Sequence, residues 1–137
     1  DFDDELLASG NFGVDGGQEA MAALLDHDAP PTAVFSMSDE MAFGAIMELD
    51  ERGLVAGRDL SLIGVDDHEF SRVVSLTTVH QAVADHGAAA ARLLLDAMPP
   101  DGDSTPLATD TAAVDLVADV ELIVRGSTGP VGASPHC

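Results

Sequence analysis

The sequence contains no lysine, no tryptophan and no tyrosine, and its single cysteine is the last of its 137 residues. One cysteine cannot form an internal disulfide, so the composition gives no sign of an oxidising compartment. His136 and Cys137 together offer two metal ligands, fewer than a closed zinc site requires. No apolar run approaches the ~20 residues that cross a bilayer, and no export signal is recognisable at the start. Because the chain begins at Asp1 rather than methionine, we expect it to be a piece of a longer protein.

Positive charge is also scarce. Five arginines stand against 25 acidic residues, which gives a formal net charge of -20 at pH 7. Proteins gain most of their affinity for nucleic acids from Lys and Arg that neutralise phosphates, so we expect DNA to repel this segment. The acidity is better explained as an adaptation for solubility, since net charge bears on solubility and not on fold. Hydrophobic residues make up 46% of the chain, enough at this length for one domain with a core.

The first half of the chain alternates helical and strand patterns. Spaced apolar residues predict helices, and short apolar runs bounded by turn residues predict buried strands. The predicted elements are a helix over residues 15–28, a strand over 32–36, a helix from 39 to 53 and a strand over 60–65. Either Ser38 or Asp39 can cap the second helix. Strand, helix and strand in this order predict a right-handed crossover within a parallel sheet.

The second half continues with fewer elements. They are a strand over residues 76–79, a helix over 85–98, an exposed loop or hairpin over 99–111, a strand over 120–124 and a disordered Gly- and Pro-rich tail from Gly126. Parallel sheets are covered on both faces and usually hold more strands than this. We therefore expect the chain to be part of a larger sheet, with an exposed edge and exposed apolar surface.

Six short motifs resemble those of one protein family, in unbroken order from about residue 10 to residue 128. They are GNF at 10–12 followed by Gly17, PTAVF at 31–35 leading into SDEMA at 38–42 with Gly44, RGLV at 52–55, DLSLIGVDD at 59–67, LTTV at 76–79 with Gln81, and LIVR at 122–125 with Ser127-Thr128. Each motif alone is weak because short patterns recur by chance, but six in order are specific. On these residues the chain resembles the LacI/GalR family of transcriptional regulators.

The resemblance implies an α/β fold, namely a parallel-sheet, periplasmic-binding-protein-like sugar-binding module of two subdomains, present here as an incomplete carboxy-terminal part. The ligand would lie in the cleft between the subdomains, and the chain would cross the hinge three times. The expected divisions are residues 1–76 in the carboxy-terminal subdomain, 77–118 crossing the hinge and returning into the amino-terminal subdomain, 119–128 as a final strand crossing back, and 129–137 as a disordered tail. A helix-turn-helix head would precede Asp1, and such heads read the major groove as dimers.

Asp66 is the first candidate for a ligand contact. In α/β sheets ligands bind beyond the carboxyl ends of the strands, and Asp66 follows the strand over 60–65 at that end. A carboxylate accepts hydrogen bonds in fixed directions, which suits adjacent sugar hydroxyls or a purine N–H. In the family, the first acidic residue of this pair contacts the effector. The alternative is that Asp66 only caps the following turn.

Four further candidates come from the resemblance. Phe12 matches the aromatic residue on which the family's ring-shaped effectors stack, and aromatic faces pack well against sugar C–H groups; the alternative is a core residue. Ser38, where the family often has Asn, and Asp39 follow a strand at the start of a helix. Asp39 either contacts ligand or only caps that helix. Gln81 faces the cleft in family members.

Other chemistry has little support. A metal cluster at Asp66–Glu69 is disfavoured, because consecutive residues in extended structure point to opposite sides and at most two could share an ion. The sequence has no Gly-x-Ser-x-Gly elbow, no Walker loop and no GxGxxG. Its five histidines share no helical face. We expect no enzyme activity, no metal and no cofactor.

The resemblance implies the effector-sensing and dimerisation region of a sugar-responsive, cytoplasmic transcriptional regulator. A small sugar or nucleoside-like effector would change the hinge angle and so control operator binding. The expected partners are this effector, a second copy of the chain and, only through the missing head, operator DNA. The alternative is a secreted sugar-binding protein of an ABC transporter, which shares the fold. The LTTxxQ and LxxRxST motifs and the lack of an export signal favour the regulator.

Overall fold

The computed structural model of the chain describes residues 4–98 and 117–130. Its elements, in chain order, are the 3-10 helix η1 (Asp4–Leu6), α1 (Val14–Leu25), β1 (Ala33–Phe35), α2 (Asp39–Glu51), β2 (Ser61–Asp66), β3 (Thr77–Gln81), α3 (Val83–Ala97) and β4 (Val120–Ile123). Every helix and strand predicted from the sequence is present, with ends that differ by a few residues. The predicted loop over 99–111 lies outside the described residues.

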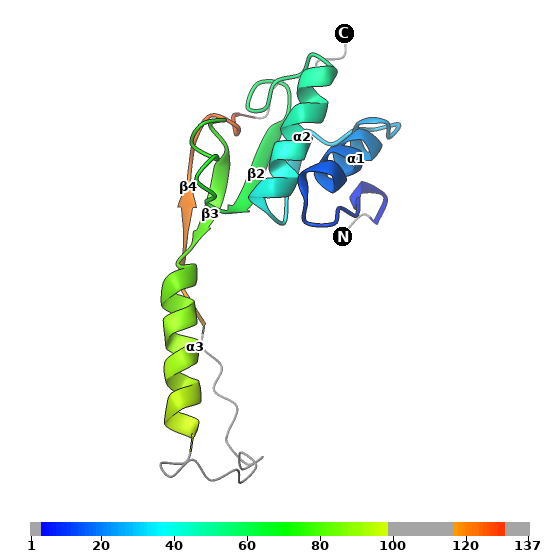
Figure 1. The fold of residues 1–137 in the computed structure, drawn as a ribbon. Helices are drawn as coiled ribbons and strands as arrows, with labels where there is room; N and C mark the ends of the chain where they lie inside the picture. The colour runs from blue at the N-terminus through cyan, green and yellow to red at the C-terminus, as the bar shows by residue number, and fades with distance from the viewer. Residues whose placement is uncertain (1–3, 99–116, 131–137) are drawn as a thin grey trace. The chain divides into compact units, whose positions relative to one another are not determined.

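The strands form one sheet in the order β1-β2-β3-β4 (Figure 1). β1 pairs with β2 and β2 pairs with β3, both in parallel, which confirms the parallel arrangement predicted from the strand–helix–strand order. The arrow of β4 runs opposite to that of β3. Because β1, β2 and β3 are parallel, their carboxyl ends meet at the same edge of the sheet, where α/β proteins bind ligands.

Of the two possible N-caps of helix α2, Ser38 and Asp39, the structure has Ser38 in that position. Its backbone is extended, with φ −152°, and its Oγ accepts a hydrogen bond from Met41 N at 3.2 Å. This bond satisfies one of the unpaired amides of the first turn. The helix ends before Gly53, whose φ of +72° is favoured by glycine and closes a helix carboxyl terminus.

The core lies where α1 and α2 meet the sheet. Its fully buried members come from α1, α2, the strands and the residues just before them, and they are Met21, Ala42, Ala45, Leu49, Leu60, Leu62 and Leu76. The two helices approach closely because Gly17 on α1 faces the backbone of Met41, and Gly44 on α2 faces the backbone of Val14. This packing fixes α2, and with it the loop that leads from β1 into α2.

The chain divides into two compact units, with boundaries between His80 and Gln81 and between Val120 and Glu121. The larger unit holds β1, β2, α1, α2 and nearly all of β3 and β4, whereas the smaller one contains α3. Helix α3 buries none of its residues, and Leu93, Leu94 and Leu95 are all exposed. No described helix is both long and apolar enough to cross a membrane.

The expectation that disorder begins at Gly126 is wrong for residues 126–130. Ser127 is buried, donates a hydrogen bond from Oγ to the Leu62 carbonyl at 2.6 Å and accepts one from Thr77 N at 2.7 Å. Gly129 N donates to Ser61 Oγ at 3.2 Å. These contacts fasten the segment after β4 to the start of β2 and β3. Residues 131–137 lie outside the described part of the chain.

Candidate ligand-binding site

Asp66 lies at the carboxyl end of β2, as the apolar run before it in the sequence predicted. It is the last residue of the strand and is exposed, and its backbone φ is +114°. Asp67 follows with φ +54°. Two consecutive non-glycine residues with positive φ are uncommon, and such outliers gather at binding and catalytic sites.

Asp39 is fully buried, and its carboxylate is used within the protein. One oxygen accepts hydrogen bonds from His68 N at 2.8 Å and Ser71 Oγ at 2.6 Å. The other accepts from Thr78 Oγ1 at 2.6 Å. Asp39 therefore ties the start of α2 to the loop after β2 and to β3. These bonds hold the loop that follows Asp66, and the Asp39 carboxylate is not exposed to solvent.

Ser38, the residue before Asp39, contacts the backbone of Phe12. Ser38 is buried, and besides capping α2 its Oγ contacts the Phe12 carbonyl oxygen at 3.5 Å. The Phe12 side chain is 63% exposed, so the alternative that it is a core residue is wrong. Its φ of +61° is again unusual for a residue with a side chain. The backbone of the loop before α1 thus lies next to the start of α2, and the Phe12 ring is exposed.

Gln81 lies in the other unit. It is the last residue of β3, is half-buried, and directly follows the unit boundary at His80. The structure links Phe12 to Ser38, and Asp39 to the loop that follows Asp66, through the hydrogen bonds just described.

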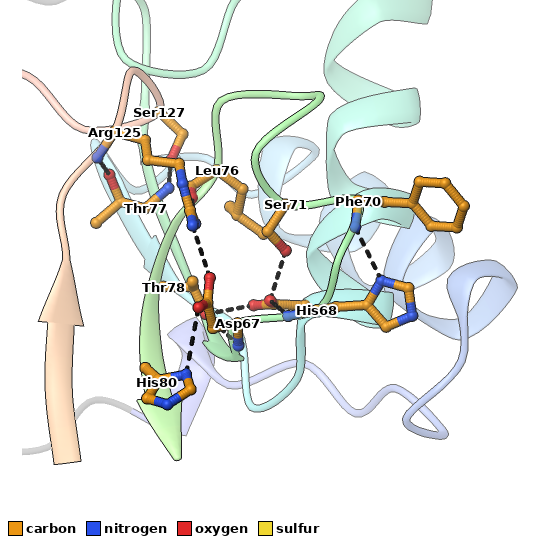
Figure 2. A network of polar contacts seen from close by, with 11 residues as sticks. Asp67, His68, Phe70, Ser71, Leu76, Thr77, Thr78, His80, Arg125 and Ser127 are labelled. Carbon is orange, nitrogen blue, oxygen red and sulfur yellow. Dashed lines mark hydrogen bonds and ion pairs between the residues drawn. The ribbon is translucent and has the colours of Figure 1, made fainter. Parts of the chain in front are cut away.

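A polar network beside Asp66 was not predicted from the sequence (Figure 2). The Asp67 carboxylate accepts a hydrogen bond from Arg125 Nη2 at 2.6 Å, and its other oxygen lies 3.2 Å from His80 Nδ1. That second distance suits an ion pair with a protonated ring, although the geometry is not that of a hydrogen bond. The Asp67 amide donates to Thr78 Oγ1 at 3.3 Å. The network joins the end of β2, β3 and the segment after β4.

The charges in this network reinforce each other. The hydrogen bond from Arg125 lowers the pKa of the Asp67 carboxyl below its ordinary value, and its positive charge adds to the effect. Arg125 is further fixed by donating from Nη1 to the Leu76 carbonyl at 2.8 Å. Asp67 and Arg125 both stand in the family-like motifs, but 58 residues separate them, and no local pattern signals that they pair. Among the described residues, no three His, Cys, Asp or Glu side chains gather as a metal site.

Comparison with known proteins assigns the fold to a family. Residues 3–128 match the family model described as the periplasmic binding protein-like domain. The chain therefore belongs to the periplasmic binding protein-like domain family.

The relatives of the chain are transcriptional regulators. The HTH-type transcriptional repressor CytR of Escherichia coli (strain K12) is 38% identical over 128 residues, which cover 92% of this chain and 35% of CytR. A LacI family transcriptional regulator from Enterococcus faecium, solved with bound ribose, has a TM-score of 0.71 and 32% identity over 90% of this chain and 43% of that one. The complex of the regulator CelR with cellobiose has a TM-score of 0.75 and 32% identity over 93% of this chain and 37% of that one.

These matches confirm the resemblance to the LacI/GalR regulators and the α/β, periplasmic-binding-protein-like fold. They favour an effector-sensing region over the alternative of a secreted transporter protein, because the matched relatives regulate transcription. The chain spans about a third of the length of the curated relatives it matches.

Proposed function

We propose that the chain is the effector-sensing part of a DNA-binding transcriptional regulator, and that its effector is a small sugar or a nucleoside-like molecule. The observation that carries this proposal is Asp66, an exposed carboxylate with a left-handed backbone at the carboxyl end of β2. Exposed Phe12 supports it, because an aromatic face and a carboxylate are the two groups that recognise a sugar ring. The ribose and cellobiose bound to two relatives support this class of ligand.

The proposed mechanism is a shift between two arrangements of the units that meet at residues 80/81 and 120/121. An effector that binds one arrangement more tightly raises its population by the difference between its two affinities. In the full-length protein, acting as a homodimer in the cytoplasm, this shift would change operator binding by a separate DNA-binding head. Coupling of about 1–3 kcal/mol is typical of such two-site systems.

The test uses the gene product that contains this chain, at its full length. Operator binding is measured by fluorescence anisotropy while D-ribose, cellobiose or ribonucleosides are added. Asp66→Ala should abolish the response to the effector, because the lost carboxylate is the proposed effector contact, and leave effector-free operator binding unchanged, because a separate head binds the operator. Glu69→Ala is the matched control, since Glu69 is an exposed acidic residue in the loop that follows. An Asp66→Ala variant that responds at the wild-type effector concentration overturns the assignment of Asp66.

A further inference from the structure

The backbone of the turn at Asp66 and Asp67 is strained. Both residues have φ in the left-handed region, +114° and +54°, which favours glycine. A strained conformation persists only where surrounding contacts hold it in place. The contacts that hold this turn therefore determine where the Asp66 carboxylate points.

Two side chains, those of Thr78 and Arg125, hold Asp67 in this turn. The bond with Arg125 joins two charged groups. Thr78 Oγ1 accepts from the Asp67 amide at 3.3 Å, which is a long and neutral hydrogen bond. Arg125 Nη2 donates to Asp67 Oδ1 at 2.6 Å, a short bond between charged groups that are both mostly buried. Charge-assisted hydrogen bonds are roughly twice as strong as neutral ones. The ion pair with Arg125 is the stronger of the two.

Arg125 is itself held rigidly, which makes it a suitable anchor. Its Nη1 donates to the Leu76 carbonyl at 2.8 Å, and its backbone N donates to Thr77 Oγ1 at 2.9 Å. Figure 2 shows the guanidinium lying alongside β3 with Asp67 beyond it. An arginine that bonds a fixed carbonyl through one nitrogen and a carboxylate through another defines the direction of that carboxylate.

We propose that the Asp67–Arg125 ion pair positions Asp66 for effector binding, an inference that rests on the proposed function. Asp67 and Arg125 are positioning residues, and of these three residues only Asp66 contacts the effector. Without the pair, the turn relaxes toward ordinary backbone angles and the Asp66 carboxylate turns away from the effector. Effector affinity then falls, whereas effector-free operator binding does not involve this turn.

The test compares three variants with wild type in the full-length gene product. Arg125→Met removes the cation, and Asp67→Asn removes the anion while retaining the shape of the side chain and its tolerance of positive φ. Arg58→Met is the matched control, because Arg58 and Asp59 form an ion pair of the same 2.6 Å length away from the turn. Affinity for D-ribose, cellobiose or ribonucleosides is measured by titration calorimetry, and operator affinity by anisotropy without effector.

Arg125→Met and Asp67→Asn are expected to weaken effector binding by about tenfold or more, the equivalent of one charged hydrogen bond. Their effector-free operator affinity, and both affinities of Arg58→Met, should match those of wild type. Wild-type effector affinity in both pair variants, with Asp66→Ala unresponsive, overturns the positioning role and leaves the proposed function standing. A wild-type response in Asp66→Ala overturns both. Equal losses of effector and operator affinity indicate general unfolding and also overturn the positioning role.

Discussion

At the scale of single residues, Asp39 is a fully buried carboxylate whose partners are one backbone amide and two hydroxyls. Asp39→Ala leaves all three donors without their acceptor, so we expect a loss of stability of about 3 kcal/mol or more. Urea denaturation measures this loss. Glu40→Ala is the control, because Glu40 is the next residue of α2 and is exposed. Equal stability of the two variants would show that the buried carboxylate contributes nothing.

Asp67 predicts a pH dependence of stability. Because Arg125 lowers the pKa of its carboxyl in the folded protein, folding favours the ionised form. The stabilisation is fully present above the unfolded pKa, about 3.9, and is lost as the pH falls through the lower folded pKa. The difference in unfolding free energy between wild type and Asp67→Asn should therefore be largest near neutral pH and shrink in acid. Denaturant titrations between about pH 6 and pH 3 measure it, and a constant difference contradicts the pairing.

The sequence predicted candidate residues better than it predicted their partners. Asp66 and Phe12 could be found because each stands in a motif with a recognisable place, the end of a strand or a Gly-rich loop. The bonds between Asp39 and Thr78 and between Asp67 and Arg125 join residues 39 and 58 positions apart. Such pairs depend on which strands become neighbours, and local spacing carries no information about that.

At the scale of elements, the close approach of α1 and α2 depends on glycine. A Cβ on Gly44 would overlap the Val14 carbonyl oxygen and come within 2.6 Å of Gln18 N. In an open helix, Gly→Ala is stabilising. In α2 we expect Gly44→Ala to cost roughly 1–3 kcal/mol, because the helices must move apart.

The control for that substitution is Gly87→Ala in α3, where a new Cβ meets nothing within 4 Å among the described residues. It should stabilise the protein by about 0.5–1 kcal/mol through the usual helix preference. Thermal unfolding compares the two variants with wild type. Equal changes in both would mean that propensity, and not packing of α1 on α2, governs Gly44.

The elements themselves were largely predictable, because apolar spacing and turn residues are local signals. The segment after β4 was not. Its glycines and Pro130 are typical of a tail, yet Ser127 is buried through bonds to residues 50 and 65 positions away. A serine in a Gly-rich stretch does not reveal that its hydroxyl forms hydrogen bonds with the backbone of two strands.

At the scale of the whole molecule, the chain leaves apolar surface open along β1. Among the described strands β1 pairs on one side only, and Phe35 is 56% exposed. A largely apolar cavity of about 390 Å³ lies beside it, lined mainly by η1, α1, β1 and their flanking residues, among them Leu6, Leu7, Met21, Val34 and Met37. This agrees with the expectation of an incomplete sheet with an exposed edge, a surface that favours pairing with another chain.

The net charge of -20 acts against that pairing. Two copies of the 137-residue chain repel each other, and the repulsion extends over the Debye length, about 30 Å at 0.01 M salt but only about 3 Å at 1 M. The apolar attraction along β1 acts only at contact and is not weakened by screening. The balance between the two should therefore reverse with salt concentration.

We accordingly predict that the chain, expressed by itself, is monomeric in about 0.02 M NaCl and self-associates in about 1 M NaCl. Sedimentation velocity at the two salt concentrations measures the change. Phe35→Ser removes the exposed aromatic side chain of β1, and it should lower the association at high salt while leaving the monomer at low salt unchanged. Val117→Ser is the matched control, because Val117 is 93% exposed but lies outside the sheet. Equal self-association of the two variants at high salt would mean that the chain associates through a surface other than β1.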